Sequence, residues 1–327
     1  MKQNILLSIC IPTFNRCELL IQSMEALVNQ VSQFDINDIE IIVSDNNSID
    51  QTSQAIQSII RDNSKINIRH YRQEENIGAV RNNYFLLQSA VGDFIYLVSD
   101  DDIFLPGSLK KILTIIRLYP ELDAICPGIN TFVDSVEEIK TSPLLQKDER
   151  VNDKNKVIVK LGTMITFISS VVFRRNILTD KNLKNFENLF PQSFIFLDVI
   201  ARQNGCFFLM QPCLGMRVNV SIVYDLVKVF VDDFNELLIY AYNLEYSRQA
   251  IRTITEGHSK WLAGAIYHFK KSSYKPNIQK RLKDTIKVFS VWWTYPVIVL
   301  RIVLAIWLPD YHNNSLSKYI WVQKIII

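Results

Sequence analysis

Apolar runs and amphipathic stretches alternate along the first third of the chain. Four runs rich in β-branched residues are each followed by a stretch whose apolar side chains recur at helical spacing. The runs cover residues 5–11, 39–43, 66–71 and 93–98, and the amphipathic stretches cover residues 18–30, 54–60, 79–90 and 106–119. This alternation predicts an α/β fold with an open, mostly parallel sheet and helices on both of its faces.

A cluster of polar and turn-forming residues follows each predicted strand. The clusters are residues 12–16, 44–50, 76–78 and 99–102. Ligands of open α/β sheets bind outside the carboxyl ends of the strands. The sequence therefore predicts a functional site at that edge of the sheet.

The pattern beyond residue 120 is more mixed. We expect strands at residues 124–127, 164–173 and 206–210, a polar loop over 141–156, and helices over 225–255 and 259–271. No internal repeat and no low-complexity tract interrupts the chain.

The composition is that of a globular protein and excludes several classes of partner. Of the 327 residues, 48% are hydrophobic and 21% are charged, and the net charge of +3 is too small to indicate a nucleic-acid-binding face. The five cysteines form no CxxC pair, which disfavours a zinc site or a disulfide framework. The first apolar run is short and leads directly into Pro12 without a cleavage-type segment, so we expect a cytosolic protein.

Three consecutive carboxylates, Asp100, Asp101 and Asp102, directly follow the apolar run 93–98. Adjacent carboxylates near a surface repel one another by about 1 kcal/mol per pair. Mg²⁺ and Mn²⁺ prefer oxygen ligands and would relieve this repulsion. The alternative is a solvated acidic turn that caps the next helix, but the apolar strand before it favours a metal. No GxxxxGK[ST] or GxGxxG motif is present, so a phosphate would be held through the metal rather than by a glycine-rich loop.

Four motifs occur in the order and spacing of a known family. They are residues 9–16, 43–50, 76–83 and 99–102. With these motifs the chain resembles family-2 glycosyltransferases of the GT-A fold, and within them the abequosyltransferase-type enzymes of O-antigen assembly. The resemblance implies a GT-A catalytic domain over residues 1–220, with a nucleotide-binding half (about 1–120) and an acceptor half (about 121–220). A helical C-terminal region would follow over residues 221–327.

The resemblance also assigns a nucleotide-sugar site. It implies that Pro12 and Thr13 line the base pocket with Arg16 nearby, that Asp45 accepts hydrogen bonds from the base, and that Arg81 lies near the base and the diphosphate. The alternatives are a turn residue for Asp45 and a solvated helix residue for Arg81.

The metal motif departs from the family pattern at its first position. The family commonly has Asp-x-Asp-Asp, and Ser99 stands here in place of the first aspartate. The resemblance implies that Asp101, supported by Asp102, binds Mn²⁺ or Mg²⁺ and that Asp100 contacts the nucleotide sugar.

The catalytic base is harder to assign. The family usually supplies it from a Glu-Asp pair that opens a helix, and Ser193 and Phe194 stand where that pair would be. Asp198, about one helical turn further on, is the nearest carboxylate and the candidate base. The alternatives are an ordinary polar residue on this helix, a displaced base, or a different stereochemical outcome.

An apolar segment near the end of the chain, residues 288–308, approaches the length that spans a bilayer. It carries tryptophans, follows several basic residues, and contains Arg301 near its middle, which is costly for a true span. An interfacial hairpin, a single span and a helix packed on the protein are all open. We expect peripheral contact with the cytosolic face of the inner or plasma membrane, where a lipid-linked acceptor would lie.

These observations predict an enzyme that moves a hexosyl or deoxyhexosyl group from a nucleotide-diphosphate donor to a saccharide or lipid-linked saccharide during surface-polysaccharide synthesis. The alternative is a non-catalytic nucleotide-sugar-binding or scaffold protein in a membrane-bound assembly. Ser99 and the missing Glu-Asp pair motivate that alternative.

Overall fold

The computed structural model describes residues 5–33, 38–139, 147–178, 188–218 and 228–271. The chain divides into two compact units. The first consists of residues 1–154 and 165–217, and the second of residues 155–164 and 218–327.

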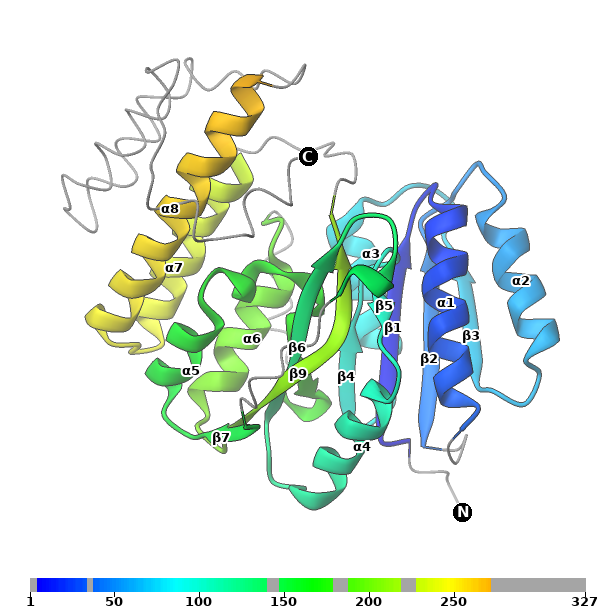
Figure 1. The fold of residues 1–327 in the computed structure, drawn as a ribbon, viewed down its shortest axis with the longest axis horizontal. Coiled ribbons are helices and arrows are strands. Elements are labelled where there is room, and N and C mark those ends of the chain that lie inside the picture. Colours follow the sequence, from blue (N-terminus) through cyan, green and yellow to red (C-terminus); the bar gives the residue numbers. More distant parts are fainter. Residues whose placement is uncertain (1–4, 34–37, 140–146, 179–187, 219–227, 272–327) are drawn as a thin grey trace. The chain divides into compact units, whose positions relative to one another are not determined.

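One nine-stranded sheet forms the centre of the first unit (Figure 1). Its strands are β1 (Leu7–Thr13), β2 (Ile39–Asp45), β3 (Ile68–Arg72), β4 (Phe94–Leu97), β5 (Ile103–Phe104), β6 (Ala124–Phe132), β7 (Glu149–Val151), β8 (Val172–Arg174) and β9 (Cys206–Arg217). The strand order is β3-β2-β1-β4-β8-β6-β9-β5, and β7 pairs with β9. Strands β3, β2, β1 and β4 are parallel, whereas β8 is antiparallel to both of its neighbours. This open mixed sheet with flanking helices confirms the predicted α/β fold class.

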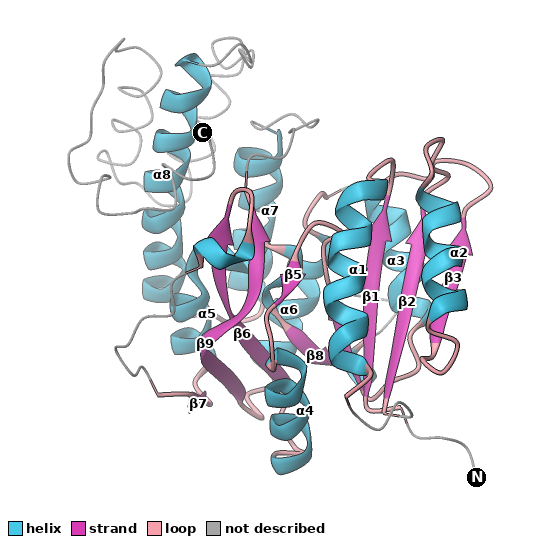
Figure 2. Ribbon diagram, turned by 45° about the vertical axis from the view of Figure 1, so that its right-hand side comes forward, coloured by secondary structure: helices cyan, strands magenta, loops and turns pink. Residues whose placement is uncertain are grey.

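Helices cover both faces of the sheet (Figure 2). In the first unit they are α1 (Cys17–Val31), α2 (Thr52–Asp62), α3 (Ala79–Ser89), α4 (Ser108–Leu118) and α6 (Pro191–Ala201), with the 3₁₀ turns η1 (Val136–Glu138), η3 (Ile168–Ser170) and η4 (Arg175–Ile177). Strand alternation sends Leu7, Ile9 and Ile11 of β1 to the α1 face, where they share a buried cluster with Leu20 and Met24. Helix α3 packs on the opposite face, against β1 and β2.

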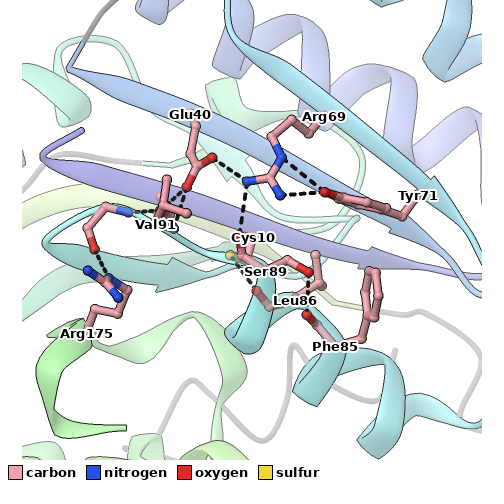
Figure 3. A network of polar contacts seen from close by, with 11 residues as sticks. Cys10, Glu40, Arg69, Tyr71, Phe85, Leu86, Ser89, Val91 and Arg175 are labelled. Atoms are coloured by element: carbon pink, nitrogen blue, oxygen red, sulfur yellow. Dashed lines mark hydrogen bonds and ion pairs between the residues drawn. The ribbon is translucent and has the colours of Figure 1, made fainter. Parts of the chain in front are cut away.

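A polar network lies on the α3 face of β1, β2 and β3 (Figure 3). The Glu40 carboxylate, almost completely buried, accepts hydrogen bonds from Ser8 Oγ (2.5 Å), Val91 N (2.8 Å) and Arg69 Nη1 (2.8 Å). The same Arg69 nitrogen donates to the main-chain oxygen of Ser89 (3.0 Å). Glu40 therefore ties three strands to the loop that leads from α3 into β4.

Two predictions for the second half of the sheet were wrong. Residues 164–173 were expected to form one strand, but only the last two belong to β8, and most of the stretch forms the 3₁₀ turns η2 (Gly162–Thr166) and η3. Gly162 has a positive φ of 56°, and Ser169 leaves helical geometry, so the backbone cannot run straight there. In the expected loop over 141–156, residues 149–151 instead form β7, and α5 (Lys154–Leu161) begins at its end.

The described part of the second unit is helical. It contains a π-helical turn, η5 (Lys228–Asp233), and the helices α7 (Phe234–Asn243) and α8 (Arg248–Lys271). The expected helix over 225–255 is interrupted where Glu245 adopts a φ of 58°. The apolar segment 288–308 lies outside the described residues.

Within the residues that the structure describes, no helix combines the length and the apolar character needed to cross a bilayer.

His258 of α8 is buried in this unit against aromatic rings. Its Nε2 lies 2.7 Å from the main-chain oxygen of Phe230, and its ring stacks on Phe234 at a centroid distance of 3.6 Å. Because the carbonyl can only accept, the neutral ring donates from Nε2. Burial lowers the pKa of His258 from its ordinary 6.5 to about 4, although the bond to Phe230 opposes this shift.

Acidification should therefore destabilise the second unit. Between about pH 6.5 and pH 4 the unfolded chain binds a proton at His258 that the folded chain refuses, so the stabilising effect is complete above pH 6.5 and is lost as the pH falls. The expected loss is about 3 kcal/mol across this window. Urea unfolding followed by circular dichroism at several pH values measures it, with His258→Gln as the comparison because the amide keeps a donor for Phe230. Equal pH slopes in the two proteins would contradict the prediction.

Candidate functional site

The loops after β1 and β2 meet at the carboxyl edge of the parallel half of the sheet. Thr13 and Asp45 are register partners at the strand ends, and Asn46 N donates to Thr13 O (2.9 Å). Asn15 N donates to Ser48 Oγ (2.8 Å), and Asn15 Oδ1 accepts from the main-chain nitrogen of the next residue, Ile49 (2.8 Å). These bonds hold the two predicted polar clusters side by side.

Asp45 is fully buried and organises the second of these loops. Its Oδ1 accepts from Ser48 N (2.8 Å), and its Oδ2 accepts from Ser53 Oγ in the first turn of α2 (2.5 Å). These contacts give Asp45 the turn role that was the alternative in the sequence analysis. A carboxylate oxygen can accept a second bond, so its contact with a base stays a prediction.

The end of β1 presents an incompletely satisfied polar group. Thr13 Oγ1 is buried and has no hydrogen-bond partner of good geometry, although it lies close enough to Asp100 to lower the pKa of that carboxyl slightly. Pro12, the preceding residue, is half-buried and pairs in register with Ser44 of β2. Buried hydroxyls without partners are uncommon in native proteins and often mark a ligand position.

The loop after β4 brings two aspartates to one arginine. Arg16 Nη1 lies 3.1 Å from Asp100 Oδ1 and 3.3 Å from Asp101 Oδ2, and both carboxylates are about 95% buried. Ser99 Oγ donates to the other oxygen of Asp101 (2.5 Å). Asp102 is also buried, so three carboxylates face a single guanidinium in this loop.

The electrostatics of this cluster follow from burial and crowding. Burial raises the pKa of Asp100 to about 6, with Arg16 opposing the shift and Asp101 adding to it. Burial lowers the pKa of Arg16, but the charges of Asp100 and Asp101 more than compensate and raise it. The cluster therefore carries negative charge in excess of what Arg16 neutralises, and an added cation would be stabilised there.

Asp102 has a different set of partners. Its Oδ2 accepts from Ser169 Oγ of η3 (2.6 Å), its carboxylate also accepts from the main-chain N–H of Arg217, and its main-chain oxygen accepts from Ser23 Oγ of α1 (2.7 Å). Burial, followed by the charge of Asp101, raises its pKa well above the ordinary value. The structure thus brings Asp100 and Asp101 together at Arg16 and holds Asp102 elsewhere.

Asparagines that the sequence analysis did not single out attach α3 to this edge. Asn46 Oδ1 accepts from Ile77 N (2.9 Å), and Asn82 exchanges two hydrogen bonds with Ser44 at the end of β2 (2.6 and 3.0 Å). Arg81 precedes Asn82 in the first turn of α3 and is exposed, so the helix start carries its positive charge at the rim of the site. Their place in the motif 76–83 was the available signal.

The candidate base, Asp198, lies in the third turn of α6. The first turn of this helix is held by Gln192 Nε2 donating to Thr166 O (3.0 Å) and Ser193 Oγ donating to Ile165 O (2.8 Å). Those carbonyls belong to the segment that continues into η3 and the contact with Asp102. Asp198 lies seven residues after Pro191, about 10 Å further along the helix axis.

The donor chemistry fits a divalent cation that is shared with a ligand. Within the described ranges, no group of three or more His, Cys, Asp or Glu side chains could hold a metal by itself. Asp100 and Asp101 nevertheless offer two carboxylates at one point, and Mg²⁺-type ions commonly take one or two carboxylates and complete their shell with phosphate oxygens and water. The excess negative charge and the unpartnered hydroxyl of Thr13 agree with such a ligand.

Comparison with known proteins gives a consistent family. The family model described as "Glycosyl transferase family 2" matches residues 8–180. A GalNAc(5)-diNAcBac-PP-undecaprenol beta-1,3-glucosyltransferase of Campylobacter jejuni is 32% identical over 233 residues, which cover 67% of this chain and 70% of that protein. The abequosyltransferase RfbV of Salmonella typhimurium is 29% identical over 216 residues, 62% of each protein.

Solved structures share the fold at low sequence identity. The S. aureus TarS 1-349 complex with UDP-GlcNAc matches with a TM-score of 0.61 and 18% identity over 92% of this chain and 87% of that one, and the match to a longer TarS chain spans 52% of its length. The mannosyltransferase PcManGT of Pyrobaculum calidifontis, solved with GDP-Man and Mn²⁺, matches with a TM-score of 0.51 and 14% identity over 92% of this chain and 86% of that one. The fold is therefore the GT-A arrangement that the sequence motifs predicted.

Proposed function

This chain belongs to glycosyl transferase family 2, and from that premise we propose that it transfers a sugar from a nucleotide-diphosphate donor to a saccharide or lipid-linked saccharide. The observation that carries the proposal is the convergence of Asp100 and Asp101 on Arg16, beside the unpartnered hydroxyl of Thr13. A diphosphate with its cation supplies the missing charge and the missing acceptor at that point.

We assign the donor subsites along the carboxyl edge of β1, β2 and β4. Pro12, Thr13 and Asp45 would bind the nucleobase end, and Arg81 at the start of α3 would face the base and the diphosphate. The complexes of TarS with UDP-GlcNAc and of PcManGT with GDP-Man support a nucleotide-sugar donor. The choice of nucleobase and sugar is a question for the experiment below.

The reaction breaks the bond between the anomeric carbon and the leaving diphosphate, on which negative charge grows. Mn²⁺ or Mg²⁺ held by Asp101, with Asp100 as the second carboxylate, would supply Lewis-acid stabilisation of that charge. We retain Asp102 from the sequence prediction only as a neighbour of this set, because its carboxylate is bonded to Ser169. Arg16 lies close enough to both aspartates to turn its donors to the phosphate oxygens.

The acceptor hydroxyl must lose a proton as it attacks the anomeric carbon. Asp198 is the proposed base from the sequence, and its distance along α6 from the helix start means that the acceptor would have to lie beside the third turn. A positioned base typically contributes about 10²–10⁴-fold to the rate.

A lipid-linked acceptor at the cytosolic face of the membrane is the finer form of the proposal. It is supported by the Campylobacter jejuni relative, whose name specifies an undecaprenol diphosphate-linked saccharide, and it would place this chain in surface-polysaccharide (O-antigen- or capsule-like) synthesis. Under this proposal residues 1–220 form the catalytic domain and residues 221–327, with the segment 288–308, provide peripheral membrane contact.

A thermal-shift screen of nucleoside diphosphates, with and without Mn²⁺, tests the donor site. One nucleotide at about 100 times its Kd should stabilise the folded chain by about 2.7 kcal/mol, a shift of a few degrees, and Mn²⁺ should increase that shift. No response to any nucleotide would refute the proposal. A Mn²⁺-dependent shift without sugar transfer to any acceptor tested would favour the non-catalytic binding protein, and detected transfer would exclude it.

A further inference from the structure

One hydroxyl group bridges both ends of the loop that carries the donor-site aspartates. Ser169 Oγ accepts from the main-chain nitrogen of Ser99 (3.0 Å) and donates to the carboxylate of Asp102 (2.6 Å). Asp102 N donates to Ser99 O (3.3 Å) across the same turn. Asp100 and Asp101 lie between these two anchors, so their direction depends on the bridge.

The bridge is itself fixed on several sides. Ser169 is fully buried, and its main-chain oxygen accepts from the hydroxyl of Tyr96 in β4 (3.1 Å). Asp102 accepts from the main-chain N–H of Arg217 at the end of β9, and its carbonyl accepts from Ser23 of α1. Polar groups that are buried and mutually bonded in this way hold a defined geometry.

The same segment links the two halves of the first unit. Ser169 lies only a few residues after the carbonyls of Ile165 and Thr166, which hold the first turn of α6. A displacement of η3 would therefore move the aspartate loop and the start of α6 together.

From this geometry we infer that Ser169 and Asp102 are positioning residues for the donor site. They set the direction of the Asp100 and Asp101 carboxylates without binding the cation or the donor themselves. The inference rests on the proposed function and revises it at one residue, because the sequence motif alone makes Asp102 a metal ligand. Misplacement of reacting groups by about 1 Å can cost about 100-fold in rate, so a small rotation of this loop should be measurable.

Calorimetric titration of the full chain tests the inference, using the nucleoside diphosphate preferred in the thermal-shift screen, with and without Mn²⁺. In Ser169→Ala we expect the gain in nucleotide affinity due to Mn²⁺ to fall by about tenfold, on the scale of such misplacement, while the affinity without Mn²⁺ stays unchanged. Ser169→Thr keeps a hydroxyl that donates and accepts, and it should restore the Mn²⁺-dependent gain. A folded Ser169→Ala protein that melts at a lower temperature but keeps the full gain would overturn the inference.

A second pair of variants separates positioning from metal binding even if Ser169→Ala does not fold. Asp102→Asn keeps the shape of the side chain and one acceptor for Ser169, so it should retain most of the Mn²⁺-dependent gain, whereas Asp101→Asn should lose it. Equal losses in the two variants would identify Asp102 as a ligand and overturn the inference alone. A wild-type chain whose nucleotide binding ignores Mn²⁺ would overturn the proposed function of this site, and the inference with it.

Discussion

Replacing Asp101 with asparagine is expected to reduce donor turnover by about 10²–10³-fold, the usual cost of removing one group that stabilises transition-state charge. The amide keeps the shape of the side chain and can still accept from Ser99, but it removes one of the two negative charges at Arg16. Charge on the leaving diphosphate would then be less stabilised. Release of nucleoside diphosphate from the preferred nucleotide sugar in the presence of Mn²⁺ measures the rate without knowledge of the acceptor.

Asp62→Asn is the matched control for this variant. Asp62 is an exposed aspartate at the end of α2, so the same chemical change there should leave turnover unchanged. If Asp101→Asn released nucleotide as fast as the control, the assignment of the donor site to the loop after β4 would be wrong.

Removing the Glu40 carboxylate should produce the largest loss of stability. Glu40→Ala leaves Arg69 without its buried partner and takes the acceptor from Ser8 and Val91 (Figure 3). Breaking a buried ion pair from one side typically costs about 3–5 kcal/mol, because a charge stays behind uncompensated. Arg69 is about one-third exposed, so water can solvate part of it and the loss should lie at the lower end of that range. The free energy of unfolding in urea measures the effect.

Glu25→Ala provides the comparison, since Glu25 is exposed on α1 and its removal should change stability by less than about 0.5 kcal/mol. A double-mutant cycle with Arg69→Met isolates the coupling between the two charges. Equal stabilities of Glu40→Ala and Glu25→Ala would show that the network does not hold the α3–β4 loop.

The first half of the sheet could be predicted from sequence because each strand there is long, apolar and followed by a helix. The second half could not. Strands β5, β7 and β8 have only two or three residues, too few to show a period. Ser169 illustrates the difficulty, since its side chain serves the loop after β4 and its backbone leaves helical geometry within a stretch that looks like a strand.

The location of the candidate site followed from parallel-strand geometry, but the division of labour within it did not. Asp100, Asp101 and Asp102 are chemically identical neighbours in the sequence. Their different environments come from Arg16, 84 positions before Asp100, and from Ser169, 67 positions after Asp102. Pairings at such separations depend on the folded sheet and leave no local pattern in the chain.

The contact of Arg16 with two aspartates also bears on the order in which ligands arrive. A free metal ion entering alone must compete with a positive group that is tethered within the site and therefore present at a high effective concentration. A diphosphate that enters together with its ion offers the displaced guanidinium a new anionic partner. We expect the ion alone to bind weakly and the ion–nucleotide complex to be the species that the protein captures.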